Sequence, residues 1–212
     1  MADPKDDRQP NTILMPTEAV VRERADQYVA ALGRVAHSWN YLQERLGQLF
    51  TKVAPTAPHN IMLAVWYSQQ NDRNQRRMLR AAINAGAMSI YKDTIPTTAA
   101  DDILWLLKEA DELSGRRDQA IHAPACLTTD VNGTQMSAAY YFGNHIAYNL
   151  KDKNLIDEFD VSEWRADQLS KYIIQIVNTL DRGTQSWPQK RPSLSRELRR
   201  QQLESSPQQP KK

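Results

Sequence analysis

The sequence predicts a mainly α fold: a four- to five-helix bundle with a small β-hairpin inserted after the third main helix. Two observations lead to this prediction. Apolar residues recur at helical spacing through most of the chain, including a long heptad series, and a short β-forming stretch surrounds Asn132-Gly133. At 212 residues the chain is long enough to bury a sizeable core without a disulfide or metal staple.

The first predicted helix covers about residues 21–53 and carries two apolar series, each with a period of seven residues. The series are offset by four, so both lie on one face of a single helix. Pro55 and Pro58 end this helix, because proline lacks the amide donor and clashes with the preceding turn. The heptad indicates either the seam of a bundle or an intermolecular coiled coil. The two series are Val21, Tyr28, Val35, Leu42 and Leu49, and Ala25, Leu32, Trp39, Leu46 and Val53.

Two further helices follow in the middle of the chain. One is predicted over about residues 71–91, before the break at Pro96. The next begins at a Thr98 cap, has Asp101 three residues later, and ends before Pro124. Their expected inner faces comprise Met78, Leu79, Ala82, Ile83, Ala87 and Ile90 in one, and Ile103, Leu106, Leu107, Ala110 and Leu113 in the other.

The hairpin is predicted from strands at 125–130 and 134–142 joined at Asn132-Gly133, a dipeptide that favours the positive φ angles of a two-residue turn. Residues 145–150 could add a third strand. A last helix opens at Asp160 with Glu163 and ends at Gly183. Trp39, Trp105 and Trp164 fall on apolar stripes and are expected in the core.

We expect a flexible leader at 1–17, a single helical domain at 18–186 and a disordered basic tail at 187–212, within which a short helix could form near 194–203. The net charge is +2, but the tail has seven Lys and Arg against two Glu, so the main body is slightly acidic. Such a body is not a broadly basic nucleic-acid binder. The longest apolar run, 61–67, is too short to span a bilayer, and no signal-peptide core is present, so a cytoplasmic location is expected.

Several kinds of chemistry lack support in the sequence. The seven glycines form no phosphate-binding loop. His37, His59, His122 and His145 have no metal-ligand spacing with one another or with Cys126. We therefore expect no metal and no cofactor, and Cys126 is read as a small packed residue rather than a nucleophile.

One constellation breaks the apolar pattern near the end of the third main helix: Arg117, Asp118 and His122. On a helix, Arg117 and His122 are about 140° apart, so they do not stack, but they can edge one groove, especially opposite a second copy of the helix. Asp118 lies four residues before His122, and a carboxylate there favours the protonated imidazole.

An Arg, a polar residue, three more residues and a His, late in a helix of an all-α bundle, resemble the signature of HEPN domains. The hairpin insert departs from a plain four-helix bundle. The resemblance implies a homodimer that brings two motifs into one cleft and cleaves RNA without metal, with His122 as general acid/base, Arg117 stabilising the phosphorane and Asp118 orienting them. Many such domains act in toxin–antitoxin, phage-defence or RNA-processing systems, which implies an RNA substrate and a cognate antitoxin or other partner protein.

Each residue of the motif also has a structural alternative: His122 could cap its helix and Arg117 could be a surface charge. The whole chain could likewise be a non-catalytic helical dimer that binds a partner protein. Two weaker groups accompany the motif. Arginines that could contact RNA, or simply form a solvated face, are Arg73, Arg76, Arg77, Arg80 and Arg116. Residues that could support the Arg/His cleft, or simply pack, are His37, Asn40 and Glu44.

Overall fold

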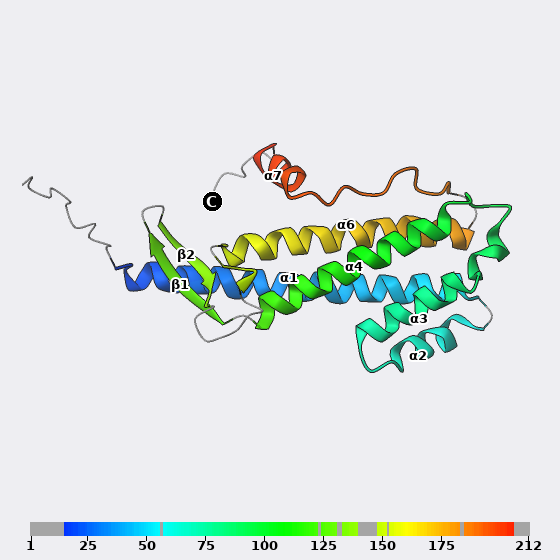
Figure 1. Cartoon of the computed structure of the whole chain (residues 1–212), viewed down its shortest axis with the longest axis horizontal. Coiled ribbons are helices and arrows are strands. Elements are labelled where there is room, and N and C mark those ends of the chain that lie inside the picture. Colours follow the sequence, from blue (N-terminus) through cyan, green and yellow to red (C-terminus); the bar gives the residue numbers. More distant parts are fainter. Residues whose placement is uncertain are drawn as a thin grey trace, which may run out of the picture.

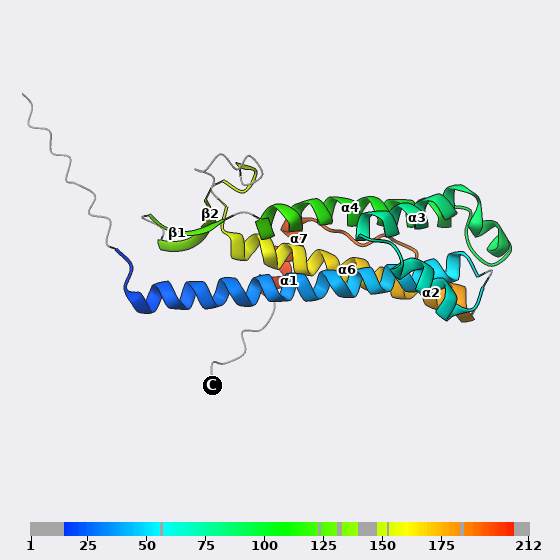
Figure 2. The same ribbon diagram turned by 90° about the horizontal axis from the view of Figure 1, so that it is seen from below.

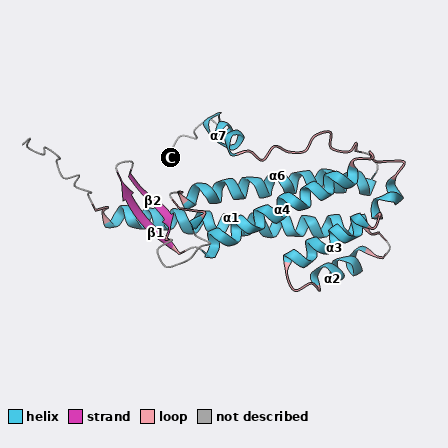
Figure 3. Cartoon of the chain, viewed as in Figure 1, coloured by secondary structure: helices cyan, strands magenta, loops and turns pink. Residues whose placement is uncertain are grey.

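The protein is mainly helical with a small two-stranded antiparallel hairpin (Figures 1 and 3), which confirms the mainly α class and the presence of a hairpin. This computed structural model describes residues 15–55, 57–122, 124–130, 133–139, 148–151, 153–182 and 185–205. The elements are α1 (Glu18–Val53), α2 (His59–Tyr67), α3 (Asp72–Asn84), the 3-10 helix η1 (Ala87–Tyr91), α4 (Ala99–His122), β1 (Ala125–Asp130), β2 (Gly133–Ala138), α6 (Leu155–Arg182) and α7 (Arg196–Ser205).

Helix α1 runs along the whole bundle and carries the heptad seam. Thr17 caps its first turn by accepting a hydrogen bond from the Val20 amide. The seam is buried from Val35 onward, whereas Val21 near the start is 40% exposed. The heptad therefore forms an intramolecular core over most of its length, and its first turns extend beyond that core.

Helix α6 packs along α1 and also along α4, so these three long helices form the body of the molecule (Figures 1 and 2). Helices α2 and α3 cover α1 near its C-terminal end, and α3 also packs on α4. Trp39 and Trp164 are buried, as expected, and Trp105 packs edge-on against Tyr172 at the margin of the main core. This arrangement places the C-terminal end of α4 beside α1 and the start of α3.

The predicted helix over 71–91 is shorter in the structure. Helix α3 ends at Asn84, and Gly86 adopts φ 84°, a left-handed conformation that glycine tolerates and that terminates the helix. The chain then continues as the 3-10 helix η1. The sequence also did not indicate α2, whose nine residues bury Met62 and Trp66 against the end of α1.

Strands β1 and β2 form an antiparallel hairpin, with Ala125 opposite Ala138 and Asp130 opposite Gly133. Gly133 has φ 119° and is the first residue of β2. The sequence predicts Gly133 in the turn and the strand from residue 134, so the strand begins one residue earlier than predicted. Strand β2 ends at Ala138, earlier than predicted. Of the expected third strand, 145–147 lie outside the described residues and 148–151 form a turn.

Helix α6 starts at Leu155, five residues before the predicted Asp160. The side chain of Asn154 accepts a hydrogen bond from the Ile156 amide at 3.1 Å and so provides an earlier cap. Within the part of the chain described, no helix is both long and apolar enough to cross a lipid bilayer.

Residues 185–205 follow a defined path back along α6, where the sequence predicts a disordered tail (Figure 1). Trp187 is 6% exposed, and its indole nitrogen donates to Asp102 at 2.9 Å. Arg191 donates to the same carboxylate at 2.7 Å. The segment ends in α7, close to the expected short helix, where Arg199 makes two hydrogen bonds to Asp160.

Candidate functional site at the end of helix α4

Arg117, Asp118 and His122 all lie on the last two turns of α4. The buried stripe of this helix runs through Ala110 and Leu113, which are 0% and 4% exposed. Arg117 follows Leu113 by four residues and therefore continues the stripe toward α1. The buried stripe of α4 thus ends at a charged residue, Arg117, which lies at the edge of the hydrophobic core.

The Arg117 guanidinium is held on several sides. Its Nε and Nη2 donate to Asp118 Oδ1 at 3.0 and 2.5 Å. Its central carbon lies 4.7 Å from the centre of the Trp39 ring, which is a cation–π contact. Its Nη1 is 3.8 Å from Asp72 Oδ2. With 22% of its side chain exposed, Arg117 is fixed in position and still accessible from solvent.

Trp39 and Asp72 link Arg117 to the rest of the bundle. The indole nitrogen of Trp39 donates to Asp72 Oδ2 at 3.2 Å, which joins α1 to the first turn of α3. Asn71 caps this turn by accepting from the Asn74 amide at 2.9 Å. Neither partner could be predicted from sequence, because Trp39 falls on an apolar stripe and Asp72 lies far from Arg117 along the chain.

Arg76 extends the same network into the interior. Its side chain is only 2% exposed, its Nε donates to Asp111 Oδ1 at 2.7 Å, and its Nη1 lies 3.5 Å from Asp72. Arg80 also donates to Asp111, at 2.8 Å. Arg73 and Arg77 are exposed. The arginines of α3 therefore point in different directions, and Arg76 is enclosed within the protein, where it ties α3 to α4.

His122 is the last residue of α4 and is exposed. Because the helix is continuous from Arg117 to His122, the two side chains leave its axis about 140° apart. Asp118 lies four residues before His122, on the same side of the helix. The structure therefore brings Arg117 and Asp118 into direct contact and places His122 at the end of the helix, on the side of Asp118.

The three residues expected to support this cleft lie on α1. His37, Asn40 and Glu44 are all exposed. Glu44 accepts a hydrogen bond from Gln48 at 3.4 Å and lies 3.8 Å from Arg45, and both of these residues belong to its own helix. The α1 residue that reaches Arg117 is Trp39 instead.

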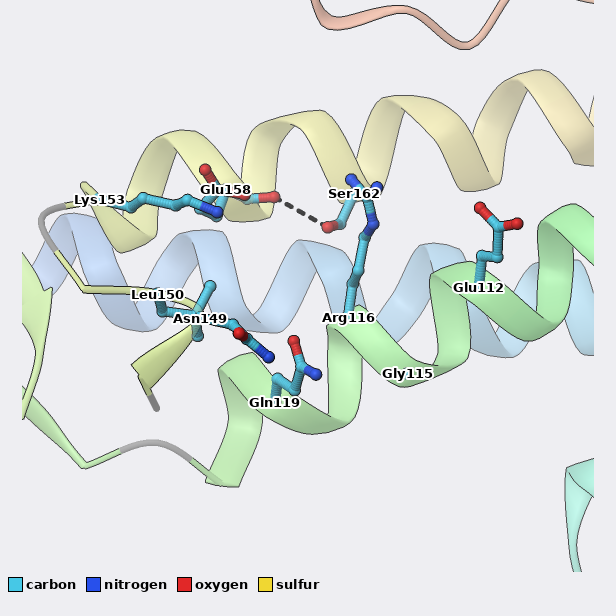
Figure 4. Close-up of a pocket in the computed structure, with 9 residues that line it drawn as sticks. All are labelled: Glu112, Gly115, Arg116, Gln119, Asn149, Leu150, Lys153, Glu158 and Ser162. Atoms are coloured by element: carbon cyan, nitrogen blue, oxygen red, sulfur yellow. Dashed lines mark hydrogen bonds between the residues drawn. The ribbon is translucent and has the colours of Figure 1, made fainter. Parts of the chain in front are cut away.

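Arg116 leaves α4 on a different side and reaches into a crevice between α4 and α6 (Figure 4). The crevice has a volume of about 410 Å³. Gln119 and Asn149 point toward each other across one end of it, and Lys153 extends along its α6 side (Figure 4). Apart from Arg116, the sequence did not single out these residues, because the turn at 148–151 comes from a distant part of the chain.

Within the described ranges, no group of three or more histidine, cysteine or carboxylate side chains is arranged to hold a metal ion. No protein-family model, no curated protein and no solved structure matches the chain. The residues at the end of α4 and those that contact them are therefore the basis for assigning a function.

Proposed function

We propose that the protein is a HEPN-like, metal-independent endoribonuclease that acts as a homodimer. The observation that supports this most directly is the end of α4, whose last two turns carry a fixed, partly exposed arginine and an exposed histidine. An arginine stays charged at all relevant pH values and can bind two phosphate oxygens at once. A histidine titrates near neutrality and can move a proton.

The reaction would proceed by attack of the ribose 2′-hydroxyl on the adjacent phosphorus. His122 would take the 2′-hydroxyl proton as general base. Arg117 would stabilise the negative charge of the pentacoordinate phosphorane. The bond to the 5′-oxygen then breaks, and this oxygen leaves with a proton, which gives a 2′,3′-cyclic phosphate and a 5′-hydroxyl. In a dimer, a second copy of His122 would supply that proton.

Asp118 would orient Arg117 in this scheme. It contacts Nε and Nη2, whereas Nη1 makes no hydrogen bond to any residue within the described ranges. A phosphate that binds Nη1 would leave Asp118 in place and would replace Asp72, whose Oδ2 lies 3.8 Å from Nη1. The Trp39 ring would keep the guanidinium in place during this exchange.

The test is cleavage of a single-stranded RNA in EDTA by the wild-type protein and by His122→Ala and Arg117→Ala. Each variant should lose at least about 100-fold in rate, the usual contribution of a general acid/base. Arg22→Ala, which replaces an exposed arginine of α1, is the matched control and should cleave normally. Circular dichroism checks that each variant keeps its helices.

Cleavage that needs a divalent ion, or that survives both substitutions, would eliminate this mechanism. Sedimentation at micromolar concentration is a second test, since a strict monomer could not form the composite site. A toxin or phage-defence role, with a cognate antitoxin or other partner, would follow only if the nuclease activity is found.

The second candidate is a non-catalytic helical dimer that binds a partner protein. The observation in its favour is that Arg117 already has Asp118, Asp72 and the Trp39 ring around it, which is also what a structural ion pair requires. On this reading the wild-type protein cleaves no RNA, and Arg117→Ala lowers the melting temperature without any other loss.

A further inference from the structure

The crevice between α4 and α6 has a charge pattern that the proposed catalytic centre does not use. Its walls are α4, α6 and the turn at 148–151, and it opens to solvent (Figure 4). Arg116 and Lys153 are both exposed. Neither has a carboxylate within 4.0 Å among the residues that the structure describes. Within the described part of the chain, the crevice thus holds two cations that make no ion pair.

Two carboxylates also line the crevice, but each has a partner on its outer side. Glu158 pairs with Arg196 of α7, and the Glu158 side chain is 15% exposed. Glu112 lies 3.8 Å from Lys108, one turn earlier on α4. The lining therefore carries two cations and two carboxylates, and each carboxylate has a further cation near it. The C-terminal segment contributes one of these further cations, Arg196.

A third cation increases the local positive charge. Arg165 of α6 donates to the Leu194 carbonyl oxygen at 2.9 Å, which fixes its guanidinium beside the C-terminal segment. The pKa of Arg165 is lowered, mainly by burial and then by the positive charge of Arg116. Glu109 and Glu158 act on this pKa in the opposite direction. An anion bound at Arg116 would offset the repulsion from Arg116.

The chemistry of the lining fits a phosphate group. Arg116 supplies a planar set of N–H donors that matches phosphate oxygens, and Lys153 supplies a point charge. The amides of Gln119 and Asn149 can donate to further oxygens or to a base. A volume of about 410 Å³ exceeds a single phosphate and accommodates the sugar attached to it.

The position of the crevice relates it to the proposed catalytic centre. Arg116, Gln119 and His122 follow one another at steps of three along α4, which forms a row across the surface of the helix. We infer that the α4–α6 crevice binds a backbone phosphate of the RNA strand, next to the one at Arg117 and His122. This inference rests on the proposed function for the identity of the strand, but its test does not require cleavage.

The test measures binding of a fluorescent 2′-O-methyl RNA in EDTA by anisotropy. This RNA cannot be cleaved, because its attacking oxygen is blocked. Arg116→Ala and Lys153→Ala should each weaken binding about five- to tenfold. Each should also lower the slope of log K against log[salt] by about one, which corresponds to one lost phosphate contact. Lys171→Ala removes an exposed lysine further along α6 and should change binding less than about twofold.

Binding of inorganic phosphate, measured by calorimetry, separates the two sources of phosphate. If Arg116→Ala abolishes phosphate binding and leaves RNA binding intact, the crevice is a site for free phosphate and the RNA assignment is wrong. Equal effects of the Arg116, Lys153 and Lys171 substitutions, or no RNA binding by the wild type, also overturn it. RNA that binds through Arg116 and is never cut would refute the nuclease while leaving this site in place.

Discussion

Replacing Arg76 with alanine tests whether the buried network beneath the candidate site stabilises the fold. Arg76 and Arg73 are both arginines of α3, but only Arg76 is enclosed, with 2% of its side chain exposed. If Arg76 has a structural role, Arg76→Ala must destabilise the protein and Arg73→Ala must leave its stability almost unchanged. Spacing along the sequence alone does not distinguish the two residues.

The expected magnitude follows from the contacts that are lost. A hydrogen bond between charged groups, here Arg76 Nε to Asp111 at 2.7 Å, contributes about 1.5–3 kcal/mol. The contact with the Trp39 ring at 5.4 Å adds about 0.5–1 kcal/mol. Asp111 keeps its bond to Arg80 and is 43% exposed, so it is not stranded, which favours the lower values. We expect Arg76→Ala to cost about 2–4 kcal/mol.

Urea unfolding followed by tryptophan fluorescence and circular dichroism measures this free energy. A loss of 2–4 kcal/mol corresponds to a fall in Tm of roughly 5–15 °C for a chain of this size. Arg73→Ala should stay within about 0.5 kcal/mol of the wild type. Arg76→Met, which keeps most of the buried stem, should fall between the two. If Arg76→Ala and Arg73→Ala unfold at the same urea concentration, the structural role assigned to Arg76 is refuted.

Three further predictions concern stability. Gly33→Ala should stabilise the protein by up to about 1 kcal/mol, because a Cβ at this position of α1 meets nothing within 4 Å. Gly47→Ala should be at least about 1 kcal/mol less stable than Gly33→Ala, because its Cβ would lie 3.0 Å from the buried Trp66 ring. Equal melting temperatures of the two variants would contradict this. Burial raises the pKa of Tyr172 to about 12, above the unfolded value of 10.0, so its contribution to stability is complete below pH 10 and is lost as the pH rises from 10 to about 12. Tyr172→Phe should show a smaller decline over that interval, and an identical decline would mean that other groups cause it. Trp187→Ala should cost about 3 kcal/mol in chemical unfolding, and a value near zero would show that residues 185–205 leave the bundle in solution.

The helical elements could be predicted because their signals are local. The heptad of α1 can be recognised without knowing what packs against it, Thr98 directly precedes the first residue of α4, and Gly133 is the first residue of β2. Gly86 shows the limit of such reasoning. A helix interrupted by one glycine has nearly the same apolar pattern as a continuous one, and its end depends on the conformation that the fold imposes.

The candidate site was predicted only in part, because its contacts join distant segments. Arg117 and Asp118 are neighbours in sequence, but Trp39 and Asp72 come from α1 and α3. Arg76 and Arg77 look alike until the position of α4 decides which of them is covered. Residues 185–205 have the composition of a disordered segment, yet Trp187 and a few arginines find acidic partners on the helices.

Helix α1 connects two separate apolar clusters, and this has a consequence for local unfolding. The larger cluster includes Trp39 and the residues after it, whereas a small one gathers Ala31 and Val35 with Ala138 and Phe159 near the hairpin. A small cluster at one end of a rod can open while the large one remains intact. Amide protons of β1 and β2 should therefore exchange with deuterium well before those in the middle of α1, so the molecule would fray from its hairpin end first.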